Sequence, residues 1–526
     1  MSRLRLATTL LSFLAGASHA TAAPQPCESL SNLRLPDTTI TMAVSTSGTF
    51  TPPDGTPLER LPAFCRVVGV IRPTSDSQIE FEVWMPAAGW NGKFQGIGNG
   101  GFAGAISYVS LAQAMGRGYA AASTDTGHKG GATDASWALG HPEKVIDFGH
   151  RAIHEMTVKG KAVVAAFYGE SPRRSYFASC SNGGRQALME AQRYPEDYDG
   201  IVAGAPAAAW TRFMFSFVWN SQAMVRPSAH IPPATLAVLE QAIVAACDRS
   251  DGVPDGVLVA PDACRFDPRT LLCTDAESAE CLGAEQAAAL TAIYDGPRTS
   301  GGTALARGFP PGAETGPGGW AEWLTGPAPG ESVQAAFAQG ALAHMVFQRP
   351  DYDLRTFDFD RDPAAVEDKI GPMLNATDPD LSAFHKRGGK LILFHGWNDP
   401  ALSAHETVDY YEAVRARMGT AVDALVRLYL IPGLQHCTGG PGATYCGGIN
   451  VPVRDAEYDL SAALERWVEE GLAPGEFVAT AAPDRSNLAE PAPATPRRRI
   501  CPYPQVASLR GTGSPDDPGA WTCEAH

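Results

Sequence analysis

Apolar and polar positions along the chain follow two different patterns. At residues 79–85 apolar side chains occupy alternate positions until Pro86 ends the run, which predicts a β strand. Residues 64–71 form a compact apolar run that predicts another strand. We therefore expect residues 24–90 to be rich in β structure.

From about residue 90 onward, short apolar runs are separated by segments of helical periodicity. The expected strands are residues 94–97, 119–123, 175–179 and 201–204, and the expected helices are about 147–168 and 185–193. The rhythm breaks at residues 208–385, where Trp, Phe, Gly and Pro are frequent, and resumes with strands 390–394 and 426–431 and helices 404–418 and 458–470. Strands alternating with helices predict an α/β fold with a mainly parallel sheet covered on both faces. Residues 24–207 and 386–526 would form this unit, with residues 208–385 as an inserted domain.

Composition and charge agree with a globular protein that acts on small molecules. The 526 residues are 44% hydrophobic and 19% charged, and 54 Gly and 42 Pro predict many turns. The net charge of −16 disfavours nucleic acid and anionic membrane surfaces as main partners. A small or neutral substrate fits better.

Residues 1–23 have the features of a secretory signal peptide. Arg3 and Arg5 precede an apolar run at residues 6–16, and small residues before Ala20 or Ala22 offer a cleavage site. A short membrane anchor is the alternative, but this run is shorter than the ~18 apolar residues that a span needs. We expect a secreted or periplasmic protein, in which most of the 11 cysteines form disulfides and one is left over.

Ser181 stands between the expected strand 175–179 and the expected helix 185–193. Small residues lie two positions away on either side, Ser179 and Gly183, as at a nucleophile elbow, where a sharp turn tolerates almost no side chain. The usual G-x-S-x-G motif has Gly where Ser179 stands. Taken alone, the motif is also compatible with a structural turn.

Asp399 and His436 each follow an expected strand later in the chain. This is the order Ser, Asp, His of an α/β-hydrolase, in which the histidine is the general base and the aspartate orients it. His405 fits the role of base less well because it lies in the following helix, and His395 because it precedes the acid.

Cys180 precedes Ser181, and Cys437 follows His436. A hydrogen bond between the serine and the histidine would bring these cysteines within bridging distance, which is ~4.4–6.8 Å between Cα atoms. We therefore predict a disulfide that links the nucleophile to its base. Two unrelated cysteines are the alternative.

With these residues the sequence resembles the tannase and feruloyl esterase family, which includes an enzyme acting on mono(2-hydroxyethyl) terephthalate. The resemblance rests on Cys180-Ser181-x-Gly183-Gly184, Gly396-x-x-Asp399-Pro400 and His436-Cys437, and it extends to residues 96–101, 375–381 and 501–504. It implies an exported serine esterase with an α/β-hydrolase core. It also implies a large lid inserted between nucleophile and acid, which matches the break at residues 208–385.

The reaction that we expect is two-step acyl transfer on esters of phenolic or terephthalic-type aromatic acids. The backbone N–H of Asn182 and that of Gly100 or Gly101 would bind the oxyanion, although each glycine could equally serve an ordinary turn. A lipase or peptidase on the same core, and a non-catalytic exported binding protein, are the alternatives.

Residues 247–257 concentrate carboxylates and turn formers. The side chains of Asp248, Asp251 and Asp255 and the carbonyls of Val253 and Val257 could bind Ca²⁺. Spacing alone is equally compatible with a solvated turn, and the family resemblance implies a structural calcium site in the lid.

The resemblance also implies four further disulfides and leaves Cys446 unpaired. These pairs are Cys27–Cys65, Cys247–Cys264, Cys273–Cys281 and Cys501–Cys523.

His150 and His154 lie four residues apart on an expected helix and could bind zinc. Glu155 does not complete an HExxH motif, and no third ligand is evident, so a structural role is favoured.

Overall fold

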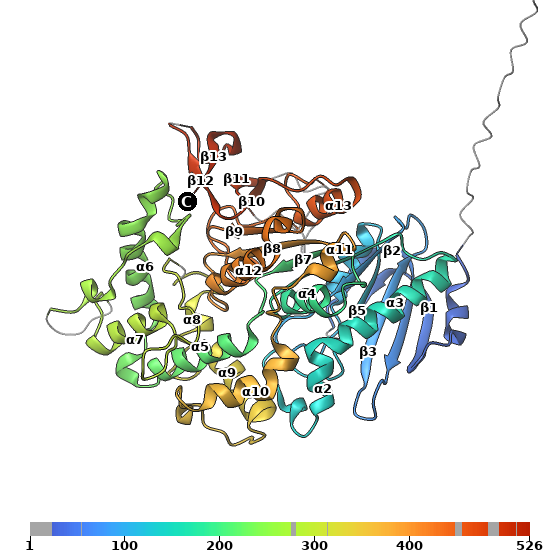
Figure 1. Cartoon of the computed structure of the whole chain (residues 1–526), viewed down its shortest axis with the longest axis horizontal. Helices are drawn as coiled ribbons and strands as arrows, with labels where there is room; N and C mark the ends of the chain where they lie inside the picture. The colour runs from blue at the N-terminus through green and yellow to red at the C-terminus, as the bar shows by residue number, and fades with distance from the viewer. Residues whose placement is uncertain are drawn as a thin grey trace, which may run out of the picture.

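The computed structural model describes residues 24–53, 55–274, 280–312, 314–447, 455–481, 494–511 and 513–525, without the side chains of residues 250, 251, 494 and 495. The predicted signal peptide lies outside the described residues. Figure 1 traces the chain from the N-terminal strands in blue to the C-terminal strands in red.

A nine-stranded sheet of order β1-β2-β3-β5-β4-β6-β7-β8-β9 forms the centre of the protein. Strands β1, β2, β3 and β5 pair antiparallel, and β5, β4, β6, β7, β8 and β9 pair parallel, as expected for an α/β-hydrolase core. The strands are β1 (Thr38–Phe50), β2 (Leu58–Ile71), β3 (Ile79–Pro86), β4 (Lys93–Ile97), β5 (Ala120–Thr124), β6 (Arg174–Cys180), β7 (Gly200–Gly204), β8 (Lys390–Gly396) and β9 (Val426–Ile431).

Helices cover both faces of this sheet because the central strands are apolar on both sides. On β7, for example, Ile201 belongs to the core under helices α3, α4 and α12, whereas Val202 belongs to the opposite core under α1 and α13. These helices are α1 (Tyr108–Gly116), α3 (Ala152–Tyr168), α4 (Asn182–Arg193), α12 (Ala404–Met418) and α13 (Leu460–Glu470), and the short α2 (Pro142–Ile146) precedes α3.

Between β7 and β8 the described chain is helical and adds no strand to the sheet. Its α-helices are α5 (Trp210–Ala223), α6 (Pro233–Cys247), α7 (Ala284–Asp295), α8 (Trp320–Trp323), α9 (Val333–Gly340), α10 (Asp362–Leu374) and α11 (Ser382–Lys386). In Figure 1 α5 to α10, drawn in green to yellow, lie at the side of the molecule away from β1.

Helix α6 belongs to a longer apolar segment, Pro227–Cys247. Among the described residues this is the segment long and apolar enough to cross a membrane by length and composition alone, with a mean hydropathy of 1.2. Its side chains Leu236, Leu239 and Ile243 pack in the core of the inserted helices.

The C-terminal part adds two small antiparallel sheets that the apolar pattern did not predict. They are formed by β10 (Phe477–Ala481) with β11 (Ala494–Ile500), and by β12 (Gln505–Leu509) with β13 (Trp521–Ala525). Their strands are short, and β11 contains three consecutive arginines at residues 497–499. Alternation of apolar and polar residues is therefore too weak there to reveal a strand.

Candidate active site

Ser181 forms a sharp turn between β6 and α4. Its backbone has φ 64°, ψ −127°, a conformation that few side-chain-bearing residues adopt. A Cβ atom at Gly183 would collide with Ser179 Oγ, and one at Gly184 with the carbonyl oxygen of Gly204. The small residues after Ser181 are thus required by close packing, and the turn has the geometry of a nucleophile elbow.

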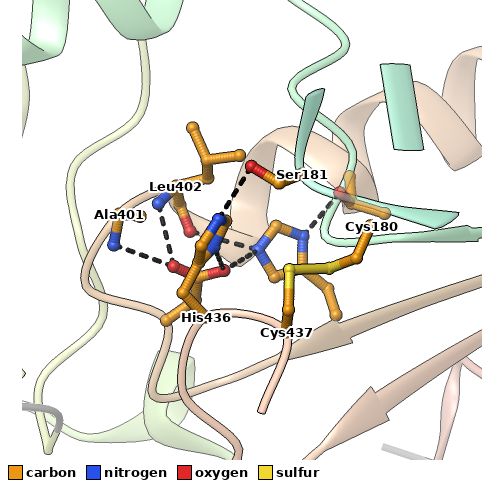
Figure 2. The surroundings of a disulfide bond; sticks show 9 residues. Cys180, Ser181, Ala401, Leu402, His436 and Cys437 are labelled. Atoms are coloured by element: carbon orange, nitrogen blue, oxygen red, sulfur yellow. Dashed lines mark hydrogen bonds and ion pairs between the residues drawn. A yellow bond between two sulfur atoms is a disulfide. The ribbon is translucent and has the colours of Figure 1, made fainter. Parts of the chain in front are cut away.

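Ser181, His436 and Asp399 meet beyond the carboxyl ends of β6, β9 and β8. Ser181 Oγ lies 2.9 Å from His436 Nε2, and His436 Nδ1 lies 2.8 Å from Asp399 Oδ2. In Figure 2 the Ser181 side chain points toward the ring of His436. In this geometry the hydroxyl donates to Nε2, and Nδ1–H donates to the carboxylate.

The carboxylate of Asp399 is held from several sides. The backbone N–H groups of Ala401 and Leu402 donate to Oδ1 at 2.8 and 2.9 Å, and His395 Nε2 lies 3.1 Å from Oδ2 (Figure 2). Burial by itself raises the pKa of Asp399, but His436 and His395 outweigh it and hold that pKa well below its ordinary value. Asp399 is therefore a permanently charged partner for His436.

His395 also belongs to the site. Its sequence position argued against a role as the general base, and it gave no sign that the residue contacts Asp399. Its ring is completely buried, and Nδ1 accepts a hydrogen bond from the Thr407 hydroxyl at 2.7 Å, so that Nε2–H faces Asp399. The sequence feature that could have indicated this contact is its position four residues before Asp399, at the end of β8. That feature is weak evidence, because the spacing does not tell which way the side chain points.

A disulfide joins Cys180 to Cys437, with 6.0 Å between their Cα atoms (Figure 2). The structure also forms the other four bridges of the predicted set, Cys27–Cys65, Cys247–Cys264, Cys273–Cys281 and Cys501–Cys523. Among the described residues Cys446 carries a free, buried thiol.

A pocket lined mainly by aromatic rings opens onto Ser181 and His436. Its aromatic residues are Phe102, Trp210, Phe213, Phe217, Trp323 and Phe337, and five of these six belong to the segment inserted between β7 and β8. Trp323 packs edge-on against the ring of His436, with 5.2 Å between centroids, and lies parallel to Phe337. Among the described residues the lining contains neither Arg nor Lys.

The predicted oxyanion donors fall on two sides of the elbow. Asn182 and Gly101 line the aromatic pocket together with Ser181, whereas Gly100 lines a separate, more polar cavity of about 230 Å³ together with Ser179 and Cys180. Gly101 has a positive φ of 56°, and a Cβ there would lie 2.5 Å from a carbonyl oxygen of Ala132. The geometry therefore favours Gly101 over Gly100 as a group that faces the serine.

The predicted calcium residues lie in the loop after α6. Both carboxylate oxygens of buried Asp248 accept from the Gly256 N–H at 3.1 Å, and Asp255 pairs with Arg498. Burial and the charge of Asp255 raise the pKa of Asp248. Asp248 and Asp255 thus place two carboxylates in one loop, and carboxylate oxygen is the donor type that a hard cation binds.

Of the remaining predicted ligands, Val253 and Val257 are buried in the same loop. The side chain of Asp251 lies outside the described part of the chain.

The fold and the site together define an α/β-hydrolase: a serine on an elbow after a parallel strand, hydrogen-bonded to a histidine and through it to an aspartate. The sequence comparison matches residues 65–523 to the family described as tannase and feruloyl esterase. The chain therefore belongs to the tannase and feruloyl esterase family and is a carboxylic ester hydrolase.

Three similar proteins cover nearly all of the chain. An uncharacterized esterase of Xanthomonas campestris is 44% identical, with 99% of this chain and 96% of the relative covered. Mono(2-hydroxyethyl) terephthalate hydrolase of Piscinibacter sakaiensis is 33% identical, with 88% and 85% covered. The crystal structure of feruloyl esterase B from Aspergillus oryzae superimposes with a TM-score of 0.86 at 28% identity, covering 95% of this chain and 99% of that one.

Proposed function

We propose that Ser181, His436 and Asp399 are the catalytic triad of a serine carboxylesterase that hydrolyses esters of aromatic carboxylic acids. The hydrogen bonds of 2.9 and 2.8 Å that link the three side chains support the roles of nucleophile, base and orienting acid. The observation that carries the substrate class is the pocket of six aromatic rings at Ser181. A planar acyl group stacks favourably in such a pocket.

In the first step His436 Nε2 accepts the proton of Ser181 Oγ as that oxygen attacks the ester carbonyl carbon. The carbonyl oxygen becomes an oxyanion, for which the N–H groups of Asn182 and Gly101 are the proposed donors. His436 then gives the proton to the departing alkoxide, and the alcohol leaves an acyl-serine behind. In the second step His436 takes a proton from water, which attacks the acyl carbon, and the proton returns to Ser181 as the acid departs.

The lining of the pocket gives the substrate class a finer definition. Because the described lining contains neither Arg nor Lys, a free carboxylate on the acyl group would enter the pocket without an ion-pair partner. We therefore infer that neutral phenolic acyl groups, of the feruloyl or galloyl type, are better substrates than terephthalate monoesters.

We also propose that residues 208–385 act as a lid, since five aromatic residues of the pocket come from that segment. A structural Ca²⁺ held by Asp248, Asp255 and their loop would anchor this lid, and Asp251 would complete the set. The five disulfides support a secreted or periplasmic location, where such bonds persist.

The experiment that tests this function combines a serine-directed fluorophosphonate with a substrate panel. The folded protein should be labelled at Ser181, and Ser181→Ala should lose labelling together with at least about 10³-fold of its ester hydrolysis. Feruloyl and galloyl esters should be hydrolysed with a higher kcat/KM than a terephthalate monoester, a long-chain lipid ester or a peptide. Preference for the lipid ester or the peptide would overturn the aromatic assignment, and an active Ser181→Ala protein would overturn the triad.

A further inference from the structure

A cluster of one imidazole and two carboxylates lies at the far end of α4 from Ser181. His154 belongs to α3, Glu190 to the last turns of α4, and Asp197 to the turn that precedes β7. One ligand atom from each lies within 4.8 Å of the others, and His154 Nδ1 is 2.6 Å from Asp197 Oδ2. His150 is not part of this cluster, so the two histidines that the sequence paired do not come together, and the other two members of the cluster come from other elements of the fold.

Glu190 is the unusual member of this cluster. Its side chain is 1% exposed, and neither carboxylate oxygen has a hydrogen-bond partner among the described residues. A buried carboxylate without a partner is costly, so such groups are normally paired or bound to a cation. A positive charge between the two carboxylates would supply the missing partner.

The neighbouring basic groups do not supply that charge by direct contact. The Lys161 ammonium donates to the backbone carbonyl of Asp197 and not to a carboxylate. His150 hydrogen-bonds the Tyr194 hydroxyl at 2.7 Å, and burial lowers its pKa to about 4. Arg193, at the end of α4, instead donates to the Pro372 carbonyl.

We propose that His154, Glu190 and Asp197 form a binding site for a divalent metal ion of the kind that accepts both nitrogen and oxygen ligands, with Zn²⁺ as its representative. Imidazole nitrogen and carboxylate oxygen are both ligands of Zn²⁺, which binds these donor types at about 2.0–2.2 Å. The His154 ring is stacked on Tyr194 with 3.9 Å between centroids, which fixes the direction of its nitrogens. Its side chain is 29% exposed, so that an ion can reach the cluster from solvent.

Binding requires only local changes with a balanced proton count. The ion takes the position of the proton that His154 Nδ1 now donates to Asp197, and that proton leaves or moves to Nε2. A proton held by Glu190 is released as well, so both carboxylates bind as anions. The ligand atoms then draw together from their present separations. Because the three residues belong to α3, α4 and the turn before β7, the ion would tie these elements together and stabilise the fold without taking part in ester hydrolysis.

The test is Zn²⁺ binding by the purified full chain, measured by equilibrium dialysis with metal analysis while saturating Ca²⁺ occupies the loop at residues 248–257. We expect one Zn²⁺ per chain that raises the Tm. Glu190→Gln, which preserves the shape of the side chain, and His154→Asn, at a partly exposed position, should each weaken this binding by a factor of about ten or more. Each should also abolish the rise in Tm.

His150→Asn is the matched control, because His150 lies one turn earlier on the same helical stretch but outside the cluster. It should keep the wild-type zinc stoichiometry and Tm response. If Glu190→Gln does not fold, the Zn²⁺ binding and Tm response of His154→Asn test the proposal alone. Absence of bound Zn²⁺, or equal binding by wild type and His154→Asn, would overturn the proposal and leave a proton shared by Glu190 and Asp197 as the positive charge.

Discussion

Cys180 and Cys437 are separated by 257 residues in sequence, yet their Cα atoms are 6.0 Å apart and their sulfur atoms are bonded. Each cysteine is the direct neighbour of a residue of the Ser181–His436 hydrogen bond (Figure 2). The disulfide therefore links the end of β6 directly to the loop after β9, next to Ser181 and His436. Both Ser181 and Cys437 have positive φ angles.

Removal of this bridge should affect both stability and catalysis. We expect Cys180→Ala combined with Cys437→Ala to lower the free energy of unfolding by about 2–5 kcal/mol and to lower kcat in the protein that remains folded. The first effect reflects the lost cross-link, and the second reflects a less closely fixed distance between Ser181 and His436. Chemical denaturation and ester hydrolysis at a low temperature measure the two.

The pair Cys273→Ala and Cys281→Ala is the control, because that bridge closes a separation of 8 residues in the inserted segment. It should lower stability and leave kcat unchanged. An unchanged kcat in the Cys180/Cys437 variant would show that folding alone fixes the catalytic distance.

Asp399 and His395 should contribute unequally to catalysis. Asp399→Asn should lower kcat by about 10⁴-fold, because an amide cannot hold the His436 tautomer in place. His395→Gln should lower kcat less and leave KM nearly constant, because His395 positions Asp399 and touches no substrate. Thr407→Val, which removes the hydroxyl that orients His395, should have a smaller effect in the same direction. A loss in His395→Gln that appears in KM would argue against this positioning role.

The sequence predicted those parts of the site that local patterns encode. Ser181 and Asp399 follow apolar strands, so each could be placed at the carboxyl edge of a parallel sheet from its neighbours in sequence. The residue types beside Ser181 and His436 then indicated a covalent link between two distant loops. In these cases one residue and its sequence neighbours carry the information.

The parts that remained hidden depend on the packing of several elements. His395 contacts Asp399 because the chain after β8 turns back on itself, and Glu190 joins His154 because α3 and α4 pack side by side. Gly100 and Gly101 are equivalent in the sequence pattern, yet they line different cavities in the structure. None of these relationships produces a periodicity or a spacing in the sequence.

Trp323 should contribute to kcat/KM for aromatic esters in particular. It lies parallel to Phe337 with 6.2 Å between ring centroids and packs edge-on against the His436 ring, so its loss removes one wall of the proposed acyl pocket. We expect Trp323→Ala to lower kcat/KM for a feruloyl ester by about tenfold and to change it little for an acetyl ester of the same alcohol. Steady-state kinetics on the two esters measures the ratio of their kcat/KM values.

Trp219→Ala is a suitable control for this comparison. Trp219 lies in the same inserted segment, donates to the Ala292 carbonyl at 2.9 Å and does not line the described pocket. It should lower stability and leave the ratio between the two esters unchanged. If Trp323→Ala lowered kcat/KM equally for both esters, Trp323 would act through its contact with His436 and not through contact with the aromatic acyl group.

Chelation of calcium should destabilise the inserted segment. If Asp248 and Asp255 bind Ca²⁺, exhaustive treatment with EGTA should lower the Tm, and added Ca²⁺ should restore it, since an ion at 100 times its Kd contributes about 2.7 kcal/mol. Asp248→Asn should begin at the lower Tm and respond to neither reagent. Asp267→Asn, at a half-buried aspartate of the same segment, should respond as the wild type does. A wild-type Tm that is the same in EGTA and in Ca²⁺ would exclude a structural calcium ion.

Glu314 should make the stability of the protein depend on pH near neutrality. Burial, with a smaller contribution from the charge of Glu240, raises the pKa of this carboxyl to about 7 from an ordinary value of 4.5. The Tyr294 hydroxyl donates to it at 2.7 Å, and the backbone N–H of Gly312 donates to both of its oxygens. Between pH 4.5 and 7 the unfolded chain releases the proton that the folded chain retains, so stability is fully present below this window and falls as pH rises through it. Across the whole window the free energy of unfolding should fall by about 3 kcal/mol.

Glu314→Gln keeps the size of the side chain and removes the titration, so its Tm should fall less steeply than that of the wild type between these pH values. Glu322→Gln, at an exposed position of the same segment, should retain the wild-type slope. The effect extends toward the loops that carry Asp399 and His436, because Asn398 donates to the Gly312 carbonyl and Gln435, next to His436, donates to the Thr315 carbonyl at 3.1 Å. Deprotonation of Glu314 therefore weakens the segment on which the histidine loop rests. Thermal unfolding across this pH range checks the prediction, and parallel slopes for wild type and Glu314→Gln would contradict it.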